Sequence, residues 1–225
     1  MAGFTGDKMD QPSISLPRLN QPAPDFQANT THGPKKLADF KGKWLVLFSH
    51  PADFTPVCTT EFVEFARHSA DFKKLNTELL GLSVDAIFSH IQWVRSIEEM
   101  FKVKVDFPVI ADIDMKVAHA YGMIHPGASD TATVRCVFVI DDKQNVRTMI
   151  YYPLSNGRSI AEILRIVEAL QTSDANGVAT PAEWKVGQMV IVPPPRTQAD
   201  AEKRIEEAEK SGHEIQAWWF VKKKL

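Results

Sequence analysis

A short apolar segment followed by a helix start that carries a cysteine constrains the fold of this chain most. Residues 44–48 (WLVLF) are continuously apolar, as expected of a strand buried on both faces. Thr55 is a good helix N-cap, and Pro56 suits the first helical position, where a missing N–H costs nothing. Cys58 is then the third residue of the helix, near free N–H groups and the positive end of the helix dipole, which favour thiolate over thiol. The pattern predicts a buried strand leading into a helix that presents a nucleophilic cysteine.

The rest of the chain alternates strand and helix patterns. Apolar residues continue at helical spacing from Cys58 to residue 75. Residues 141–145 (DDKQN) have turn chemistry, so the strands on either side should form a hairpin. The other expected strands and helices are, in chain order, 79–84 (strand), 87–101 (helix), 107–110 (strand), 114–121 (helix), 134–140 and 146–152 (the hairpin), 159–171 (helix) and about 198–210 (charged helix). Parallel β-α-β units followed by a β-β-α tail predict a thioredoxin-like α/β layer fold.

The composition changes after residue 173. We therefore predict a thioredoxin-like domain over 1–173 and a C-terminal arm or small subdomain over 174–225, which has too little apolar periodicity for a core of its own. Trp218, Trp219 and Phe220 lie near the end of this arm. These aromatic residues could cover the parent domain or pack on another subunit. Because large aromatic side chains rarely stay exposed, we favour the second alternative and expect a dimerisation arm.

Composition and charge exclude several classes of protein. The formal net charge of −2 provides no basic field for nucleic acid, and two cysteines are too few for a disulfide scaffold. The first fifteen residues contain no apolar segment of a signal peptide, and no apolar run approaches the ~20 residues of a membrane span. We therefore expect a cytoplasmic enzyme with no nucleic-acid or membrane partner.

Several separated motifs carry a resemblance to a known family. Residues 50–61 (HPADFTPVCTTE) resemble the active-site signature of peroxiredoxins, in the form found in the 1-Cys, peroxiredoxin 6-like branch. Further segments resemble family landmarks in the right order: 23–26 (APDF), 134–139 (VRCVFV), 152–153 (YP), 157–158 (GR) and 178–184 (VATPAEW). The resemblance extends over nearly all of residues 19–184.

This resemblance implies a thiol-dependent peroxidase that reduces hydrogen peroxide and alkyl hydroperoxides. The Cys58 thiolate would attack the distal peroxide oxygen and become a sulfenic acid. Thr55 and Arg135 would bind the peroxide oxygens and Pro51 would shield the sulfur. A fixed cation with N–H donors stabilises the charge that the transition state spreads over sulfur and two oxygens. The implied enzyme needs no cofactor and no metal.

Three further residues, Glu61, Arg158 and His50, are expected to support this site. Glu61, together with Cys58, would supply the counter-charge that Arg135 needs in its predicted buried strand. The resemblance assigns Arg158 a place behind these residues and places His50 beside the sulfur. A histidine at a strand end is more often a structural hydrogen-bonding residue, so a direct role for His50 is the less favoured of the two alternatives.

Departures from related branches define the expected mechanism. Thr180 stands where 2-Cys relatives carry a resolving cysteine, and Cys136 should point into the core, away from Arg135. The sulfenic acid would then be reduced by an external thiol or other reductant that the sequence does not identify. The serine and histidine of the phospholipase element in some 1-Cys members are replaced by residues 42–45 (GKWL) and by Ala38. No phospholipase activity is therefore expected.

Other functions are compatible with the same cysteine. A peroxide sensor or holdase chaperone would use Cys58 as a trigger and the oligomer as effector. A cysteine hydrolase would need His50 as general base and would form an acyl intermediate. An inert thioredoxin-like binding module is the plainest alternative. For the peroxidase, the expected partners are a peroxide, the reductant and a second copy of the chain in a homodimer, with ring assembly left open.

Overall fold

The computed structural model describes residues 16–225 of the chain. Internal contacts divide the chain into two compact units. Unit 1 contains the residues up to 69 together with 76–158, and unit 2 contains 70–75 together with 159–225. The predicted domain limits of 1–173 and 174–225 stay a prediction.

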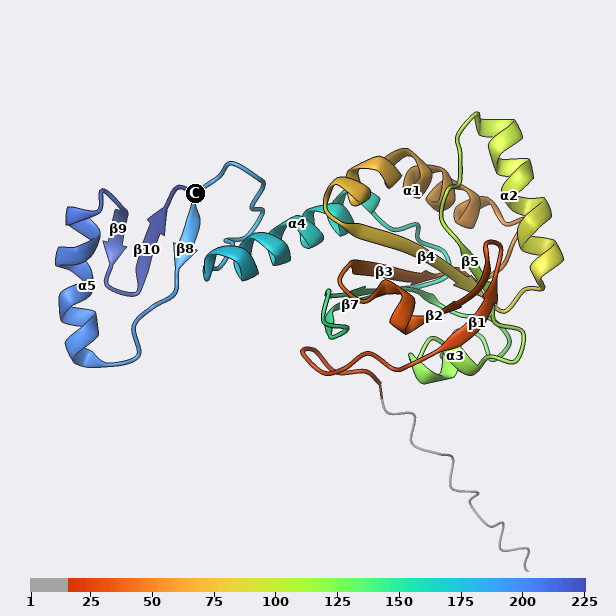
Figure 1. Cartoon of the computed structure of the whole chain (residues 1–225), viewed down its shortest axis with the longest axis horizontal. Coiled ribbons are helices and arrows are strands. Elements are labelled where there is room, and N and C mark those ends of the chain that lie inside the picture. The colour runs from red at the N-terminus through yellow and green to blue at the C-terminus, as the bar shows by residue number, and fades with distance from the viewer. Residues whose placement is uncertain (1–15) are drawn as a thin grey trace, which may run out of the picture. The chain divides into compact units, whose positions relative to one another are not determined.

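Unit 1 is built on a seven-stranded mixed sheet with the strand order β2-β1-β5-β4-β3-β6-β7 (Figure 1). Strand β3 pairs in parallel with the central strand β4, and β4 pairs in parallel with β5. On its other side β3 pairs antiparallel with β6, which forms the expected hairpin with β7. The bounds are Gln27–Thr30 (β1), Gly33–Lys36 (β2), Trp44–Ser49 (β3), Thr77–Ser83 (β4), Val109–Ala111 (β5), Arg135–Ile140 (β6) and Val146–Tyr152 (β7).

Helices cover both faces of this sheet, and alternate residues of each strand pack against them. On one face Phe48 of β3 stacks on Phe65 of α1 (Pro56–Lys74), with ring centroids 3.9 Å apart. Trp93 of α2 (Ile87–Phe101) lies beside α1, with its ring 4.5 Å from that of Phe62. On the other face, apolar side chains from the strands join those of the 3-10 helix η1 (Leu37–Phe40) and the short helix α3 (Lys116–Ala120) in one buried cluster. Cys58, at the start of α1, therefore lies on the face of the sheet that α1 and α2 cover.

Gly81 of β4 makes room for this aromatic packing. A Cβ atom at this position would lie 3.3 Å from the ring of Phe62 and 3.4 Å from that of Phe48. The distance to Phe62 is tighter than an ordinary van der Waals contact, so a side chain here would require that ring to shift by a few tenths of an ångström. The absence of a side chain thus allows α1 to pack closely on the sheet.

The predicted order of strands and helices agrees with the structure. The helix that carries Cys58 begins at Pro56, as expected, and the hairpin β6–β7 encloses the predicted turn. The fifth strand is Val109–Ala111 rather than 107–110, and the third helix is Lys116–Ala120 rather than 114–121. Strands β1 and β2 were not expected, because their residues are short polar segments at the edge of the sheet, where burial imposes no alternation.

Unit 2 contains the long helix α4 (Ile160–Asn176), the helix α5 (Gln198–Lys210) and a three-stranded sheet with the order β8-β10-β9. The strands are Val190–Val192 (β8), Glu214–Ala217 (β9) and Phe220–Lys223 (β10). A small buried cluster joins Ala169, Val178, Trp184 and Val190. The C-terminal segment is thus more ordered than its weak apolar periodicity suggested, because short strands pair through their backbones. Trp218 and Trp219 remain 43% and 56% exposed.

Among residues 16–225, none of the helices is both long enough and apolar enough to cross a membrane.

Candidate active site

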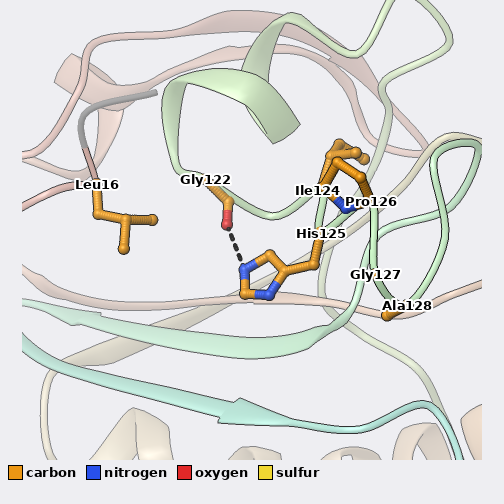
Figure 2. A pocket seen from close by; sticks show the side chains of 7 residues that line it. All are labelled: Leu16, Gly122, Ile124, His125, Pro126, Gly127 and Ala128. Carbon is orange, nitrogen blue, oxygen red and sulfur yellow. Dashed lines mark hydrogen bonds between the residues drawn. The ribbon is translucent and has the colours of Figure 1, made fainter. Parts of the chain in front are cut away.

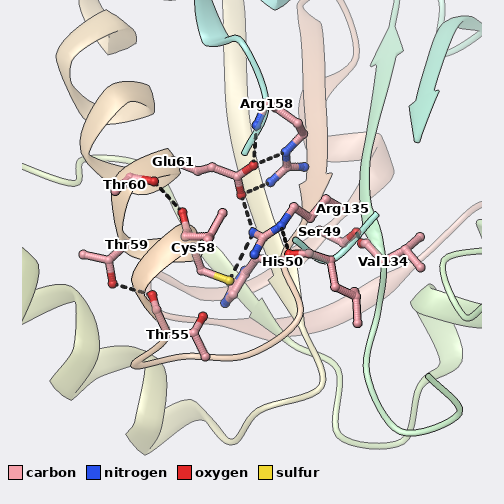
Figure 3. A network of polar contacts seen from close by, with 12 residues as sticks. Ser49, His50, Thr55, Cys58, Thr59, Thr60, Glu61, Val134, Arg135 and Arg158 are labelled. Atoms are coloured by element: carbon pink, nitrogen blue, oxygen red, sulfur yellow. Dashed lines mark hydrogen bonds and ion pairs between the residues drawn. The ribbon is translucent and has the colours of Figure 1, made fainter. Parts of the chain in front are cut away.

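Cys58 lies in the first turn of α1, and its side chain is fully buried. Its Sγ accepts a hydrogen bond from Nη1 of Arg135 at 3.3 Å (Figure 3). The cysteine and the arginine are 77 residues apart in the chain, and the antiparallel pairing of β6 with β3 brings them together. The sulfur therefore lies against a fixed positive charge and close to the N-terminal end of the helix.

Arg135 is buried, with only 3% of its surface exposed, and its orientation is fixed from two sides. Its Nε donates to the carbonyl of Leu154 at 2.9 Å, and its Nη1 donates to Oε2 of Glu61 at 2.8 Å as well as to Cys58. The predicted contact of Arg135 with both Cys58 and Glu61 is thus present in the structure.

Glu61 follows Cys58 by about one turn on α1 and links Arg135 to Arg158. Its Oε1 accepts hydrogen bonds from the backbone N and from Nε of Arg158, both at 2.8 Å, and its Oε2 accepts one from Nη2 at 2.7 Å. Burial alone would raise the pKa of Glu61, but the hydrogen bonds and charge of Arg158 outweigh burial and lower it.

The charges of this buried cluster balance only when Cys58 is ionised. The two guanidinium groups of Arg135 and Arg158 carry two positive charges, and the carboxylate of Glu61 carries one negative charge. A buried excess charge is strongly unfavourable. A thiolate at Cys58, in contact with Arg135, would make the cluster neutral.

Thr55 takes an arrangement that the sequence did not predict. Its hydroxyl donates to the carbonyl of Ala52 at 2.8 Å, so the single proton of the hydroxyl is not available to the sulfur of Cys58. The lone pairs of the oxygen remain free to accept a hydrogen bond. Pro51 is partly buried in the loop between β3 and α1, and its shielding of the sulfur stays a prediction.

His50 belongs to a second buried network. Its Nε2 lies 2.9 Å from Oδ1 of Asp53, while its Nδ1 is the buried side-chain nitrogen that lacks a hydrogen-bond partner within the described chain. Nδ1 of His90, on α2, lies 2.8 Å from Oδ2 of Asp53. Burial lowers the pKa of His50, against the opposing effect of Asp53. Burial would raise the pKa of Asp53, but the hydrogen bonds from the two histidines hold it well below its usual range.

This second network also offers the ligand types that a metal ion takes. One atom from each of His50, Asp53 and His90 lies within 4.8 Å of the others, and two imidazoles with a carboxylate suit zinc. In this structure, however, the facing atoms are joined to each other at hydrogen-bond distances of 2.8 to 3.0 Å. The arrangement is therefore that of a hydrogen-bonded carboxylate between two histidines.

Sequence reasoning missed the roles of Asp53 and His90 in this network. Asp53 stood inside the recognised motif without an assigned contact, and His90 had no motif around it. One signal was available for His90: it shares the apolar face of its helix with Trp93 and Ile97, and all three are buried. A histidine on an apolar face needs polar partners, so a buried acid could have been expected opposite it.

Cys136 lies in the core, as predicted. It is fully buried in the cluster on the face of the sheet opposite α1, and its Sγ lies 3.0 Å from Oγ of Ser49. Burial raises the pKa of the Cys136 thiol to about 11. A thiol in this state is a poor nucleophile.

A separate cavity of about 490 Å³ lies near the segment that follows α3 (Figure 2). Its lining side chains are mainly apolar, and His125 donates a hydrogen bond from Nε2 to the carbonyl of Gly122 at 3.1 Å. The lining residues are Leu16, Gly122, Ile124, His125, Pro126, Gly127 and Ala128. This cavity contains none of the residues around Cys58 and provides no nucleophile or charged group of its own.

Two family models match this chain. Residues 19–149 match that of the AhpC/TSA family, and residues 169–208 match that of the C-terminal domain of 1-Cys peroxiredoxin. A peroxiredoxin of Aquifex aeolicus is 57% identical over 223 residues, which cover 94% of this chain and 99% of that protein.

Solved structures agree with these matches. A yeast mitochondrial 1-Cys peroxiredoxin superposes with a TM-score of 0.83 at 39% identity, covering 93% of this chain and all of that one. The peroxiredoxin 6 of Arenicola marina, solved as a cysteine-to-serine mutant, superposes with a TM-score of 0.82 at 33% identity, covering 92% of this chain and 97% of that one.

Proposed function

The chain belongs to the AhpC/TSA family of peroxiredoxins, which makes it a thiol peroxidase, and we propose that it works by a 1-Cys mechanism in which Cys58 attacks the peroxide. The observation that carries this proposal is the contact between Sγ of Cys58 and Nη1 of Arg135 at 3.3 Å, inside a buried cluster whose charges balance only with a thiolate. A buried thiolate with a fixed cation beside it is the nucleophile that peroxide reduction requires.

The reaction breaks the O–O bond of the peroxide. The Cys58 thiolate donates an electron pair to the distal oxygen, forming an S–O bond. The proximal oxygen leaves with the electrons of the O–O bond and takes up a proton, giving water from hydrogen peroxide or an alcohol from an alkyl hydroperoxide. The sulfur is oxidised to a sulfenic acid and the peroxide is reduced. Arg135, already in contact with the sulfur, would stabilise the negative charge as it moves to the oxygens.

Thr55 would act as a hydrogen-bond acceptor for the peroxide. Because its only proton is donated to Ala52, the oxygen of Thr55 can receive the O–H of a bound peroxide but cannot donate to it. Arg135 has the opposite property, since a guanidinium only donates. Thr55 would therefore accept the O–H of the bound peroxide, and Arg135 would donate to a lone pair of a peroxide oxygen. Pro51 would cover the sulfur from solvent in this complex.

The 1-Cys assignment rests on Cys136 and on the C-terminal segment. Cys136 belongs to the core cluster on the sheet face opposite α1, and its high pKa disfavours the thiolate needed for disulfide exchange. Residues 169–208 match the 1-Cys C-terminal domain. The sulfenic acid would thus be reduced by an external thiol. The yeast relative is described as resolved through glutathione and thioredoxin systems, and we propose a thiol of one of these two classes here.

The segment 174–225 is proposed to act as a dimerisation arm. Trp218 and Trp219 are large apolar side chains that stay 43% and 56% exposed in the single chain, as expected of residues that a second copy covers. The cytoplasm is the compartment we propose, because two cysteines do not form a secreted disulfide framework.

Peroxide consumption with a panel of reductants tests the proposal. Reduced protein should consume one equivalent of hydrogen peroxide without a reductant and turn over repeatedly with glutathione or a thioredoxin system. Cys58→Ser should lose both activities, while the matched variant Cys136→Ser keeps them. Full activity of Cys58→Ser would overturn the assignment of the nucleophile. Consumption that stops at one equivalent with every reductant would favour the peroxide sensor or chaperone instead.

A further inference from the structure

The hydrogen-bond partners of Asp53 and His90 indicate where the protons of this network lie. Nδ1 of His90 faces both carboxylate oxygens of Asp53, at 3.0 and 2.8 Å, and Nε2 of His90 faces the carbonyl of Ile110 at 3.0 Å. A backbone carbonyl only accepts hydrogen bonds, and an ionised carboxylate does the same. Hydrogen bonds at both positions require a proton on each ring nitrogen of His90, so the geometry favours an imidazolium beside the Asp53 carboxylate.

The same reasoning determines the tautomer of His50. Its Nε2 lies 2.9 Å from Oδ1 of Asp53, so this nitrogen must carry the proton that is donated. The positive charge that would accompany a second proton is disfavoured by complete burial and by the charge of His90. Nδ1 of His50 then holds an unshared lone pair, and it has no partner among the described residues.

His50 lies against the turns of α1 that carry the cysteine. Its ring is 4.9 Å from that of Phe62, about one turn after Cys58, and 4.9 Å from that of Trp93. The indole nitrogen of Trp93 donates to Oγ1 of Thr59, the residue next to Cys58, at 3.2 Å. Figure 3 draws His50 among the residues around the Cys58 sulfur. The His50 ring, with its unpartnered Nδ1, therefore lies beside the part of α1 that carries the cysteine.

We propose that His90 is a positioning residue, whose two protons hold Asp53 as a carboxylate and thereby keep Nδ1 of His50 free of a proton beside Cys58. An unprotonated Nδ1 can accept the proton of a thiol or of a sulfenic acid, whereas a protonated one could only donate. The charged and titratable groups that face His90 in this network are Asp53 and His50. Asp85 lies behind Asp53, where its Oδ2 accepts from the backbone N of Asp53 at 3.0 Å.

The first test reads the protons directly and does not depend on peroxidase activity. Full-length, reduced protein labelled with ¹⁵N-histidine is examined by NMR at about pH 8, well above the ordinary histidine pKa of about 6.5. His90→Gln and His50→Gln assign the signals. We expect two protonated ring nitrogens at His90, and at His50 a protonated Nε2 with a bare Nδ1. A neutral His90, a protonated Nδ1 at His50, or signals of zinc ligation on adding Zn²⁺ would overturn the proposal.

The second test measures function and assumes, with the proposed mechanism, that Cys58 is the nucleophile. In His90→Gln, the rate constant for oxidation by hydrogen peroxide is measured from about pH 5 to about pH 9. This range extends well to either side of the ordinary histidine pKa. Without the imidazolium, Asp53 should draw a proton onto His50 at low pH, and the rate should fall about tenfold between about pH 8 and about pH 6. The wild type and the control His119→Gln, an exposed histidine of α3, should lack this step.

The two tests separate the proposal from the mechanism on which it rests. A uniform loss of rate in His90→Gln, with the wild-type pH profile, would show a merely structural role and overturn the proposal. If His90→Gln does not fold, the NMR experiment on the wild type decides alone, with the His90 signals assigned by their through-space contacts. If Cys58→Ser keeps its peroxidase activity, the proposed mechanism fails, while the proton positions at His90 and His50 can still be read.

Discussion

Replacing Glu61 by glutamine should weaken both the fold and the reactivity of Cys58. The carboxylate of Glu61 accepts four hydrogen bonds from Arg135 and Arg158, at 2.7 to 2.8 Å, and its side chain is only 2% exposed. An amide has the same shape but one acceptor oxygen. In Glu61→Gln the amide nitrogen would face donors of one or both arginines, and two buried guanidinium charges would lose their shared counter-charge.

The size of the effect follows from this loss. Removing one partner of a buried ion pair typically lowers the free energy of unfolding by about 3–5 kcal/mol. The position of Arg135 would then depend on the hydrogen bond from its Nε to Leu154. Losing one charge-assisted hydrogen bond that orients Arg135 costs about 1.5–3 kcal/mol, which corresponds to a roughly 10- to 150-fold slower reaction of Cys58 with peroxide.

A matched control lies on the same helix. Glu64 pairs with Arg67 on the exposed side of α1, with side chains 45% and 55% exposed. Because exposed ion pairs contribute only about 0–1 kcal/mol, Glu64→Gln should change neither property appreciably. Denaturant unfolding gives the stability, and stopped-flow fluorescence under excess hydrogen peroxide gives the rate. Equal unfolding midpoints and equal rates for the two variants would refute the idea that Glu61 holds Arg135 in place.

Four further predictions concern other parts of the molecule. Burial raises the pKa of Cys136 from 9.0 to about 11, so the unfolded chain loses this proton first as the pH rises. The free energy of unfolding should therefore fall by roughly 3 kcal/mol between about pH 9 and pH 11, and Cys136→Ala should remove that loss in alkaline unfolding curves. Mass spectrometry after one equivalent of peroxide should show oxygen added at Cys58, and a Cys58–Cys136 disulfide as the major product would make the protein a 2-Cys enzyme. Sedimentation at micromolar concentration should show a dimer, with a smaller species on deletion of 174–225; a wild-type monomer, or unchanged size in the deletion, would contradict the arm's role. Phospholipid hydrolysis should not exceed that of a heat-treated sample, and activity above this level would show that the replaced serine and histidine are not needed.

The sequence predicted those features that local chemistry or burial determines. The helix start at Pro56 and the turn of the β6–β7 hairpin depend on the preferences of a few adjacent residues, and both agree with the structure. The contact between Arg135 and Cys58 could be expected because a buried cation needs an anion. Strands β1 and β2 could not, since their short polar segments show no apolar alternation, and β1 joins the sheet through Ile110, which lies far along the chain.

Hydrogen-bond direction was the other limit of sequence reasoning. Thr55 was expected to bind a peroxide oxygen, and only the position of the Ala52 carbonyl shows that its hydroxyl proton is already donated. Likewise, the pairing of His90 with Asp53 joins residues 37 positions apart and has no local sequence signal. Such contacts depend on where β3, α1 and α2 meet in space.

The sheet order has a consequence for the chain during its synthesis. The helix that carries Cys58 and the parallel strand β4 are made well before β6, which follows the cysteine by 77 residues at Arg135. At about 5–20 residues per second, a ribosome takes roughly 4 to 15 s to add this stretch. During that time the nascent chain contains the sulfur without the guanidinium that stabilises its anion. The cysteine should therefore react with oxidants at its full rate only when β6 joins the sheet, so that an incomplete chain is oxidised more slowly at Cys58.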